Sequence, residues 1–263
     1  MLPYITLGSW TISTHLLLDL SAAIVVGVLA KWRSRREYPN LALAEIIDLT
    51  FYLFCGVLGG ALIGALLPYL IMALFGKPLP PWWWMGWQNW FGAVAGGSLS
   101  GLLYCRRHQR PIGWSFDLFA PLLPVGLILV RTGCLLAGDS HGKETTDWPA
   151  MFLPDPSGYW ASRYPTQIVD ILIGVLIAIL LFSFDGFVQR CLKKPQGWPF
   201  AGFKFWLYVF LFCSQRFYFE FWRADTPLLF GSLTWNHLYA AGGLILAVGV
   251  TAYRMRAAPG ARV

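Results

Sequence analysis

The sequence predicts an all-α integral membrane protein with seven transmembrane helices. Of its 263 residues, 57% are hydrophobic and only 13% are charged, and the mean hydropathy is +0.55. Soluble domains usually contain about 25% charged residues. The apolar residues gather into stretches close to the about 20 residues that a helix needs to cross the hydrocarbon core. We therefore expect a single polytopic membrane domain over residues 1–263.

Apolar stretches separated by polar residues give the expected transmembrane helices in order. They run approximately over residues 14–31, 45–75, 88–105, 115–137, 166–189, 203–223 and 234–255. The second stretch is long enough to be tilted or broken. Its glycines would permit close contact with another helix, and its proline would permit a kink. These residues are Gly56, Gly59, Gly60, Gly64 and Pro68.

Basic residues mark one side of the predicted bundle. Clusters that include Lys31, Arg106, Arg190 and Arg254 follow the first, third, fifth and seventh stretches. Because cytoplasmic loops are enriched in Lys and Arg, the N-terminus is expected outside and the C-terminus in the cytoplasm. The same distribution accounts for the net charge of +7 without a nucleic-acid partner.

The sequence contains none of the common local motifs for metals or nucleophiles. The cysteines occur singly, without a CxxC pair, and no HExxH, Walker loop or GxSxG is present. We therefore expect no metal site and no redox function. The cysteines are Cys55, Cys105, Cys134, Cys191 and Cys213.

Three charged residues interrupt a highly aromatic apolar stretch at helical spacing. Arg216, Glu220 and Arg223 lie within about 60° of one another on one helix face. A charge at mid-bilayer costs at least about 2.5 kcal/mol, so such a cluster predicts a functional site. The alternative is a structural ladder of ion pairs. Glu220 supplies only one negative charge, so one arginine is in excess unless Asp225 balances it.

Arg131 is another cation within apolar sequence, near the outer end of the fourth stretch. It either pairs across the bundle, holds an anion, or extends toward the interface. Planar guanidinium groups bind phosphate through two parallel hydrogen bonds. The arginines together therefore predict a site for an anionic phospholipid headgroup near the outer leaflet.

Histidines and a long polar connection lie on the same predicted side. His15, His141 and His237 each offer a proton acceptor, although an isolated histidine at an interface is more often polar packing. Residues 138–165 form the longest connection, and loops of this length are frequently functional. We expect this connection to act as a lid or to contact headgroups.

Several blocks of the sequence carry a family resemblance when taken in order. They are the glycine-rich second and third stretches, Asp117–Gly126 leading into Arg131–Gly138, His141–Lys143, Tyr164–Asp170, and Arg216–Arg223. Tyr164–Asp170 resembles the motif HPTQLYE, and Arg216–Arg223 resembles Arg-Phe-x-x-Glu-Phe-x-Arg. These blocks resemble the prolipoprotein diacylglyceryl transferases, which are seven-span enzymes of the bacterial inner membrane.

The resemblance implies a transfer reaction on lipid. Family members move the diacylglyceryl group of phosphatidylglycerol to the thiol of a lipobox cysteine in a preprolipoprotein and release glycerol phosphate. No cofactor is implied, and the reacting cysteine belongs to the substrate. The candidate catalytic residues are Arg131, Arg216, Glu220 and His15. The candidate substrate-binding residues are Arg223, Gly142, Tyr164, Gln167, His141 and Asn236.

Some positions differ from the family pattern. Cys134 replaces a frequent Asn, His15 replaces a Tyr, Ala95 replaces a frequent His, and Asp170 replaces a Glu. The expected phosphate-binding arginines are present, so His15, His141 or Glu220 is expected to take over proton transfer. Three alternatives stay open: a non-catalytic membrane protein that binds anionic phospholipid or a lipoprotein, a paralogue with a different acceptor, and a small transporter that uses the same cationic cavity.

Overall fold

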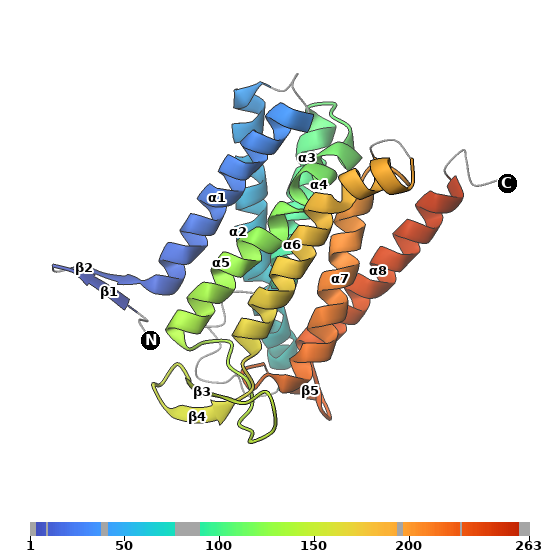
Figure 1. The fold of residues 1–263 in the computed structure, drawn as a ribbon. Helices are drawn as coiled ribbons and strands as arrows, with labels where there is room; N and C mark the ends of the chain where they lie inside the picture. Colours follow the sequence, from blue (N-terminus) through green and yellow to red (C-terminus); the bar gives the residue numbers. More distant parts are fainter. Residues whose placement is uncertain are drawn as a thin grey trace. The chain divides into compact units, whose positions relative to one another are not determined.

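The structure is a computed structural model that describes residues 4–8, 10–37, 42–76, 90–193, 197–226 and 228–257. Within these ranges the chain is mostly helical, and short antiparallel hairpins make up its strands (Figure 1). The strands are β1 Tyr4–Leu7, β2 Trp10–Ser13, β3 Met151–Pro154, β4 Trp160–Arg163, β5 Leu228–Phe230 and β6 Leu233–Thr234.

Helices lie over all the apolar stretches that the sequence indicates. They are α1 Thr14–Glu37, α2 Leu43–Leu74, α3 Trp90–Arg107, α4 Ile112–Phe119, α5 Leu122–Ala137, α6 Thr166–Cys191, α7 Phe203–Phe219 and α8 Trp235–Ala257. A short 3-10 helix, η2 Glu220–Trp222, follows α7. The prediction of an α-helical protein is therefore confirmed.

The helices have the length and composition of a membrane protein. Among the described residues, α1, α2, α6 and α8 are long and apolar enough to cross a membrane, and α4 with α5 would be a fifth span if the pair crosses as one. The fourth predicted stretch is thus two helices, interrupted at Ala120 and Pro121. Helices α3 and α7 lie over the third and sixth predicted stretches.

The chain forms two compact units, residues 1–29 with 119–263, and residues 30–118. In the second unit, α2 packs directly on α3 through glycines. A Cβ on Gly60 would lie 2.1 Å from the Gly92 carbonyl oxygen, and one on Gly96 would lie 2.2 Å from the Gly56 oxygen. The two backbones therefore touch, as the glycines predict. Gly59 faces open space within the described chain.

Helix α2 is continuous from Leu43 to Leu74, so the predicted possibility of a break is wrong. A helix satisfies its own backbone hydrogen bonds, and interrupting it inside a bilayer would expose groups that have no water to bind. The continuous helix avoids that cost, although Pro68 removes one donor.

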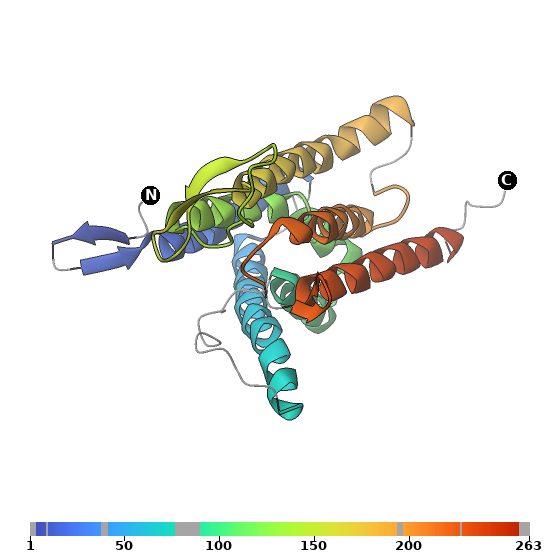
Figure 2. The ribbon, with the colours of Figure 1, turned by 90° about the horizontal axis from the view of Figure 1, so that it is seen from below.

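In the first unit, α5 packs against α6, and α7 packs against α8. Helices α6 and α8 run in one direction, and α5 and α7 run in the other (Figures 1 and 2). Small residues allow the contacts around α5. A Cβ on Gly133 would be 3.3 Å from His15 at the start of α1, and one on Gly174 of α6 would be 3.1 Å from Ile128.

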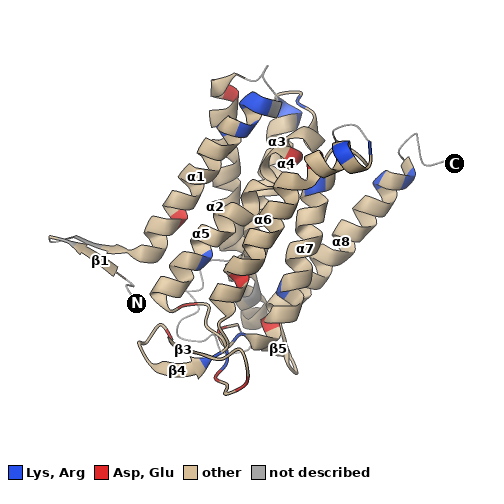
Figure 3. Cartoon of the chain, viewed as in Figure 1, with Lys and Arg blue, Asp and Glu red and all other residues tan. Residues whose placement is uncertain are grey.

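Basic residues gather at one end of each unit. Arg190 lies in the last turn of α6, and Arg254 and Arg256 lie in the last turn of α8. In the second unit the last turns of α1 and α3 are also basic (Figure 3). In the first unit, the other ends of α6 and α8 carry the polar connections.

Candidate active site

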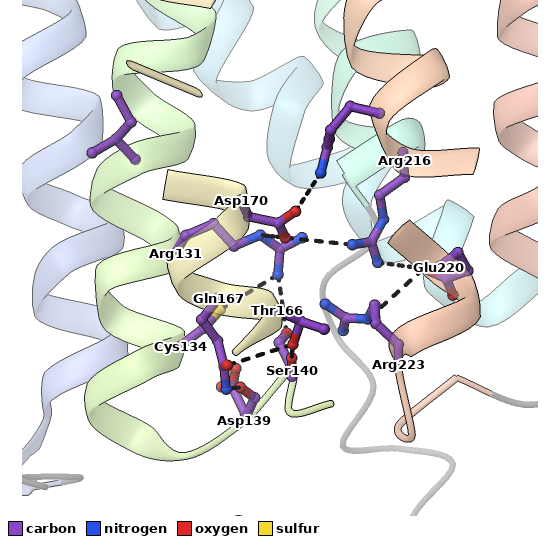
Figure 4. A network of polar contacts seen from close by, with 12 residues as sticks. Arg131, Cys134, Asp139, Ser140, Thr166, Gln167, Asp170, Arg216, Glu220 and Arg223 are labelled. Atoms are coloured by element: carbon purple, nitrogen blue, oxygen red, sulfur yellow. Dashed lines mark hydrogen bonds and ion pairs between the residues drawn. The ribbon is translucent and has the colours of Figure 1, made fainter. Parts of the chain in front are cut away.

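A carboxylate from α6 joins two arginines from neighbouring helices. The Arg131 Nε atom on α5 lies 3.0 Å from Oδ2 of Asp170, and the Arg216 Nη1 atom on α7 lies 3.5 Å from the same oxygen (Figure 4). All three side chains are at most 9% exposed. Gln215 also donates to Asp170 through its amide nitrogen. Asp170 therefore stabilises both cations inside the helix bundle.

Glu220 links Arg216 to Arg223 and so extends this network. Its Oε2 atom lies 2.8 Å from Arg216 Nη2 and 3.8 Å from Arg223 Nε, and its side chain is fully buried. Its other oxygen accepts hydrogen bonds from Thr234 Oγ1 at 3.0 Å and Asn236 Nδ2 at 2.9 Å. Because both oxygens are engaged, Glu220 fixes the positions of the arginines more readily than it could accept a proton.

Arg223 has a close ion pair with Asp225 and a buried N–H group without a hydrogen-bond partner among the described residues. Its Nη2 atom lies 2.5 Å from Asp225 Oδ2, so Asp225 supplies the balancing charge that the sequence left open. The buried Nη1 atom of Arg223 has no hydrogen-bond partner among the described residues. A buried donor without an acceptor is costly, so this atom is available for a ligand.

The three arginines and their carboxylates balance formally. Arg131, Arg216 and Arg223 carry three positive charges, and Asp170, Glu220 and Asp225 carry three negative charges. An anion bound here would therefore be held by oriented donors more than by excess charge. Asp170 supplies one of the three negative charges that balance the arginines. It was not among the candidate site residues. The cost of a charge in an apolar helix, which marked the arginines, applies to Asp170 equally.

The connection after α5 is attached to the segment that carries Arg223. Gly142 and Arg223 form an isolated antiparallel bridge, and the Lys143 N–H donates to the Trp222 carbonyl at 2.7 Å. Tyr164 stacks on Trp222 with ring centroids 4.8 Å apart. A Cβ on Gly142 would lie 2.1 Å from the Tyr164 carbonyl oxygen, so the bridge requires glycine. Gly142 and Tyr164 therefore hold the loop against the arginine segment.

The first turn of α6 holds the start of the same connection. Gln167 Nε2 donates to the Asp139 carbonyl at 2.8 Å, and Thr166 Oγ1 donates to the Ser140 carbonyl at 2.8 Å. Ser140 Oγ in turn accepts from Arg131 Nη1 at 3.0 Å. Gln167 thus positions the loop beside Arg131.

Next to Arg131, a histidine, a thiol and two carboxylates come together. His15 Nε2 lies 3.4 Å from Cys134 Sγ and 3.5 Å from Asp139 Oδ2, while His15 Nδ1 lies 2.9 Å from Asp19 Oδ2. Arg131 Nη1 is 3.7 Å from Cys134 Sγ. The structure therefore connects His15 to the arginine network through Cys134, a residue that was not among the candidates.

His141 lies in the loop directly before Gly142, outside the helices. Its carbonyl accepts from the Ala224 N–H at 3.2 Å, and its buried Nδ1 has no hydrogen-bond partner within the described residues. Burial lowers the pKa of His141 below its usual 6.5, and the cations Arg163 and Arg223 lower it further. His141 is therefore predominantly neutral near pH 7.

The candidates from the sequence fall into three groups. Arg131, Arg216, Glu220, Arg223 and Asn236 share one buried network, and His15 borders it. Gly142, Tyr164 and Gln167 hold the connection after α5 against the segment that carries Arg223 and the start of α6, and His141 lies in that connection. Asp225 is the balancing charge that the sequence analysis named as a possibility. The residues not among the candidates are Asp19, Cys134, Asp139 and Asp170.

The helices and this network define a class of protein: a multi-pass α-helical membrane protein with a buried arginine–carboxylate site. Comparison with known proteins narrows the class. A model of the prolipoprotein diacylglyceryl transferase family matches residues 3–253. The chain therefore belongs to the prolipoprotein diacylglyceryl transferase family.

Individual relatives agree with this assignment. The chain is 30% identical to a phosphatidylglycerol–prolipoprotein diacylglyceryl transferase of Hydrogenovibrio crunogenus, over 72% of this chain and 68% of the relative. It is 28% identical to the Pseudomonas fluorescens enzyme of the same name over 98% of both chains. It is 27% identical to that of Acinetobacter baylyi, over 95% of this chain and 90% of the relative.

Proposed function

We propose that this protein is an enzyme that moves the diacylglyceryl group of phosphatidylglycerol to the thiol of a lipobox cysteine in a preprolipoprotein. Family membership over nearly the whole chain supports the reaction. The observation that carries it in the structure is the row of three buried arginines linked through Asp170 and Glu220. Guanidinium groups held in fixed orientation suit a phosphate group in a site from which water is excluded.

The reaction breaks one bond and forms one. The acceptor sulfur attacks the glycerol carbon that carries the phosphate, and the carbon–oxygen bond to phosphate breaks. The electron pair of that bond leaves with glycerol phosphate, and a thioether joins the cysteine to diacylglycerol. Negative charge grows on the departing phosphate, so donors aimed at it lower the barrier. In this proposal Arg131, Arg216 and Arg223 supply those donors, and Glu220 with Asn236 keeps them oriented.

The acceptor thiol must also lose a proton. Of the three candidates, Glu220 has both oxygens engaged by arginines and hydrogen-bond donors. His141 lies in the loop next to Gly142, where Asp225 and Arg223 are among its charged neighbours. His15 faces Cys134, Asp139 and, through Cys134, Arg131. Because His15 and Cys134 border the arginine network, we place the acceptor thiol beside His15.

We further propose that one polytopic domain crosses the bacterial inner membrane seven times, with the N-terminus outside and the C-terminus in the cytoplasm. Helices over all seven predicted stretches and the basic last turns of α6 and α8 support this arrangement. It puts the arginine network and the connection over residues 138–165 on the outer side. Phosphatidylglycerol and the preprolipoprotein would then meet the site from the bilayer.

The test is a transfer assay with purified protein in phosphatidylglycerol vesicles and a lipobox peptide. The expected result is a peptide whose mass increases by a diacylglyceryl group. Removing a positioned donor typically costs about 10²–10³ in turnover, so Arg131→Ala and Arg216→Ala should reduce transfer by that much. Arg190→Ala, at the far end of α6, is the matched control and should transfer normally.

Two outcomes would contradict the proposal. Binding of phosphatidylglycerol without a modified peptide would indicate a non-catalytic lipid-binding protein. Transfer to another thiol, with none to the lipobox peptide, would indicate a paralogue with a different acceptor. Circular dichroism and elution volume in detergent show whether each arginine variant is folded, and Arg216→Lys adds a variant that keeps the charge.

A further inference from the structure

Three atoms of metal-ligand type converge beside the arginine network. They are His15 Nε2 from the first turn of α1, Cys134 Sγ from α5 and a carboxylate oxygen of Asp139 from the following loop. All three lie within 4.8 Å of one another. His15 and Cys134 are 119 residues apart in the chain, so no local sequence motif marks the set.

The distances between these atoms suit one small cation. Zinc binds sulfur at about 2.3 Å and nitrogen or oxygen at about 2.0–2.2 Å, so neighbouring ligands of a tetrahedral site lie about 3.3–3.6 Å apart. The observed separations are 3.4 Å from His15 Nε2 to Cys134 Sγ and 3.5 Å from His15 Nε2 to Asp139 Oδ2. A thiolate, an imidazole and a carboxylate are also ligands that zinc accepts together.

The surroundings of His15 match those of a metal-bound histidine. Its second nitrogen, Nδ1, lies 2.9 Å from the Asp19 carboxylate one helical turn away. A carboxylate at this position holds the proton on Nδ1 and leaves the lone pair of Nε2 for a metal. Asp19 therefore fixes both the tautomer and the direction of the ring.

Burial and charge also favour a cation here. Cys134 is only 3% exposed. The Asp139 side chain is 38% exposed, but its Oδ1 atom is buried and has no hydrogen-bond partner among the described residues. On coordinating a divalent ion the Cys134 thiol would lose its proton, and the ion would neutralise the charges of Cys134 and Asp139. Anionic groups in an apolar bundle are expensive unless they are paired or bind a metal. Arg131, which touches Cys134 Sγ, is itself paired with Asp170.

A cysteine–histidine nucleophile explains the same contacts less well. It would account for Cys134, His15 and Asp19, with Asp19 orienting the ring. It gives no role to Asp139, whose carboxylate faces the same Nε2 atom as the thiol. One nitrogen that faces both a sulfur and a carboxylate oxygen is the arrangement expected around a shared cation.

We propose that His15, Cys134 and Asp139 bind a zinc-like divalent cation whose fourth coordination position holds the thiol of the acceptor cysteine. This inference rests on the proposed transferase function and identifies the group that activates the acceptor. Catalytic zinc sites use three protein ligands and leave one position for water or substrate. A thiol that coordinates a metal loses its proton, and the thiolate is the reactive nucleophile.

The step balances without a further reactant. The acceptor thiol displaces a metal-bound hydroxide, which leaves as water with the thiol proton. The bound thiolate sulfur then forms a bond to the glycerol carbon of phosphatidylglycerol, and the bond from that carbon to the phosphate oxygen breaks. Glycerol phosphate takes the electron pair and leaves. Arg131 contacts both Cys134 and Asp170, so the metal-bound thiolate would lie next to the arginines that hold the phosphate.

Metal binding is tested on the full-length protein without reference to activity. Purified protein is stripped with a chelator and titrated with Co²⁺, because cobalt bound to thiolate absorbs in the near ultraviolet. The wild type should bind one ion per chain with that absorption, and zinc should displace it. Cys134→Ser should lose the absorption, and His15→Gln and Asp139→Asn should weaken binding. The matched control is Cys213→Ser, another buried thiol, which should bind as the wild type does.

Asp19→Asn provides a variant that leaves all three ligands in place. Removing a carboxylate that hydrogen-bonds a metal-binding histidine typically weakens metal affinity by about 10–100-fold. A weaker cobalt titration with an unchanged charge-transfer band supports the proposed site. Asp19→Asn binding cobalt as tightly as the wild type, or no stoichiometric binding by the wild type, overturns it.

The role in transfer is tested with stripped and zinc-restored enzyme in phosphatidylglycerol vesicles. Transfer that requires zinc, and is lost in Cys134→Ser, supports the proposal. Equal transfer by stripped enzyme overturns the metal while the transferase function stands. A stable lipid adduct on Cys134 overturns it in favour of a nucleophilic thiol. If neither form transfers, the proposed function fails, and the cobalt titration still decides whether the metal site exists.

Discussion

The Nε atom of Arg131 lies 3.0 Å from Oδ2 of Asp170, which joins α5 to α6 through a charged contact inside apolar sequence. The same carboxylate faces Arg216 on α7. Asp170 is therefore the shared counter-ion of two cations that belong to different helices. Its loss would leave both arginines with less compensation in a buried site.

Asp170→Asn is expected to destabilise the protein strongly. Removing one partner of a buried ion pair costs about 3–5 kcal/mol because the remaining charge is uncompensated. Thermal unfolding in detergent, followed by circular dichroism, measures the change. Asp170→Glu keeps the charge and should recover most of the stability. Glu144→Gln, a 57% exposed partner of Arg163, should cost under about 1 kcal/mol. Equal losses for Asp170→Asn and Glu144→Gln would show that the Asp170 contact is not structural.

Arg223→Lys is expected to reduce transfer while leaving the fold intact. Lysine keeps the positive charge near Asp225 but loses the planar fork, including the Nη1 donor that has no partner among the described residues. The loss of one oriented donor to a developing phosphate predicts a decrease of about 10²-fold in kcat. Steady-state kinetics against phosphatidylglycerol concentration measures it. If Arg223→Lys raises KM for phosphatidylglycerol and leaves kcat unchanged, Arg223 binds the lipid without stabilising the departing phosphate.

Gly142→Ala is expected to detach the connection over residues 138–165 from the arginine segment. The added Cβ would lie 2.1 Å from the Tyr164 carbonyl oxygen, and a backbone atom cannot move as a flexible side chain can. Limited proteolysis of the loop should become faster than in the wild type. Gly186→Ala in α6 is the control, because nothing described lies within 4 Å of its added Cβ. Unchanged proteolysis of Gly142→Ala would contradict the close contact.

The contact between α2 and α3 gives a matched pair of glycine variants. Gly60→Ala forces a Cβ to 2.1 Å from the Gly92 carbonyl oxygen, so the helices must separate. Gly59→Ala meets open space, and alanine is favoured over glycine in a helix by about 0.5–1 kcal/mol. Unfolding temperatures should therefore fall for Gly60→Ala and stay equal or rise for Gly59→Ala. A fall of the same size in both would refute the packing.

His141 is expected to make the stability of the protein depend on pH. Its pKa in the folded protein is below the unfolded value of 6.5, so the unfolded chain binds more protons as the pH falls. The stabilising effect of neutral His141 is present above pH 6.5 and is lost as the pH falls below it. Between pH 7 and pH 5 the unfolding temperature should decrease more for the wild type than for His141→Asn. An identical decrease would mean that the folded-state pKa of His141 is unshifted.

The positions of the helices could be predicted from the sequence alone. The predicted stretch over residues 166–189 is the helix Thr166–Cys191, and the stretch over 234–255 is Trp235–Ala257. Apolar length and helical spacing are local properties, so they can be read directly along the chain. The same spacing placed Arg216, Glu220 and Arg223 together, and the structure confirms that they interact. The predicted single helix face is wrong, because α7 ends at Phe219 and Arg223 follows the 3-10 helix in extended backbone.

The partners across helices were decided by the tertiary structure. Whether Arg131 meets a carboxylate depends on the rotation and depth of α6 against α5, and that packing puts Asp170 beside it. The meeting of His15 with Cys134 and Asp139 depends on how the start of α1 packs on the end of α5. Local sequence carries no signal for contacts between residues 119 positions apart. The sequence therefore determined a membrane protein with costly buried arginines, and the packing of its helices determined which groups those arginines meet.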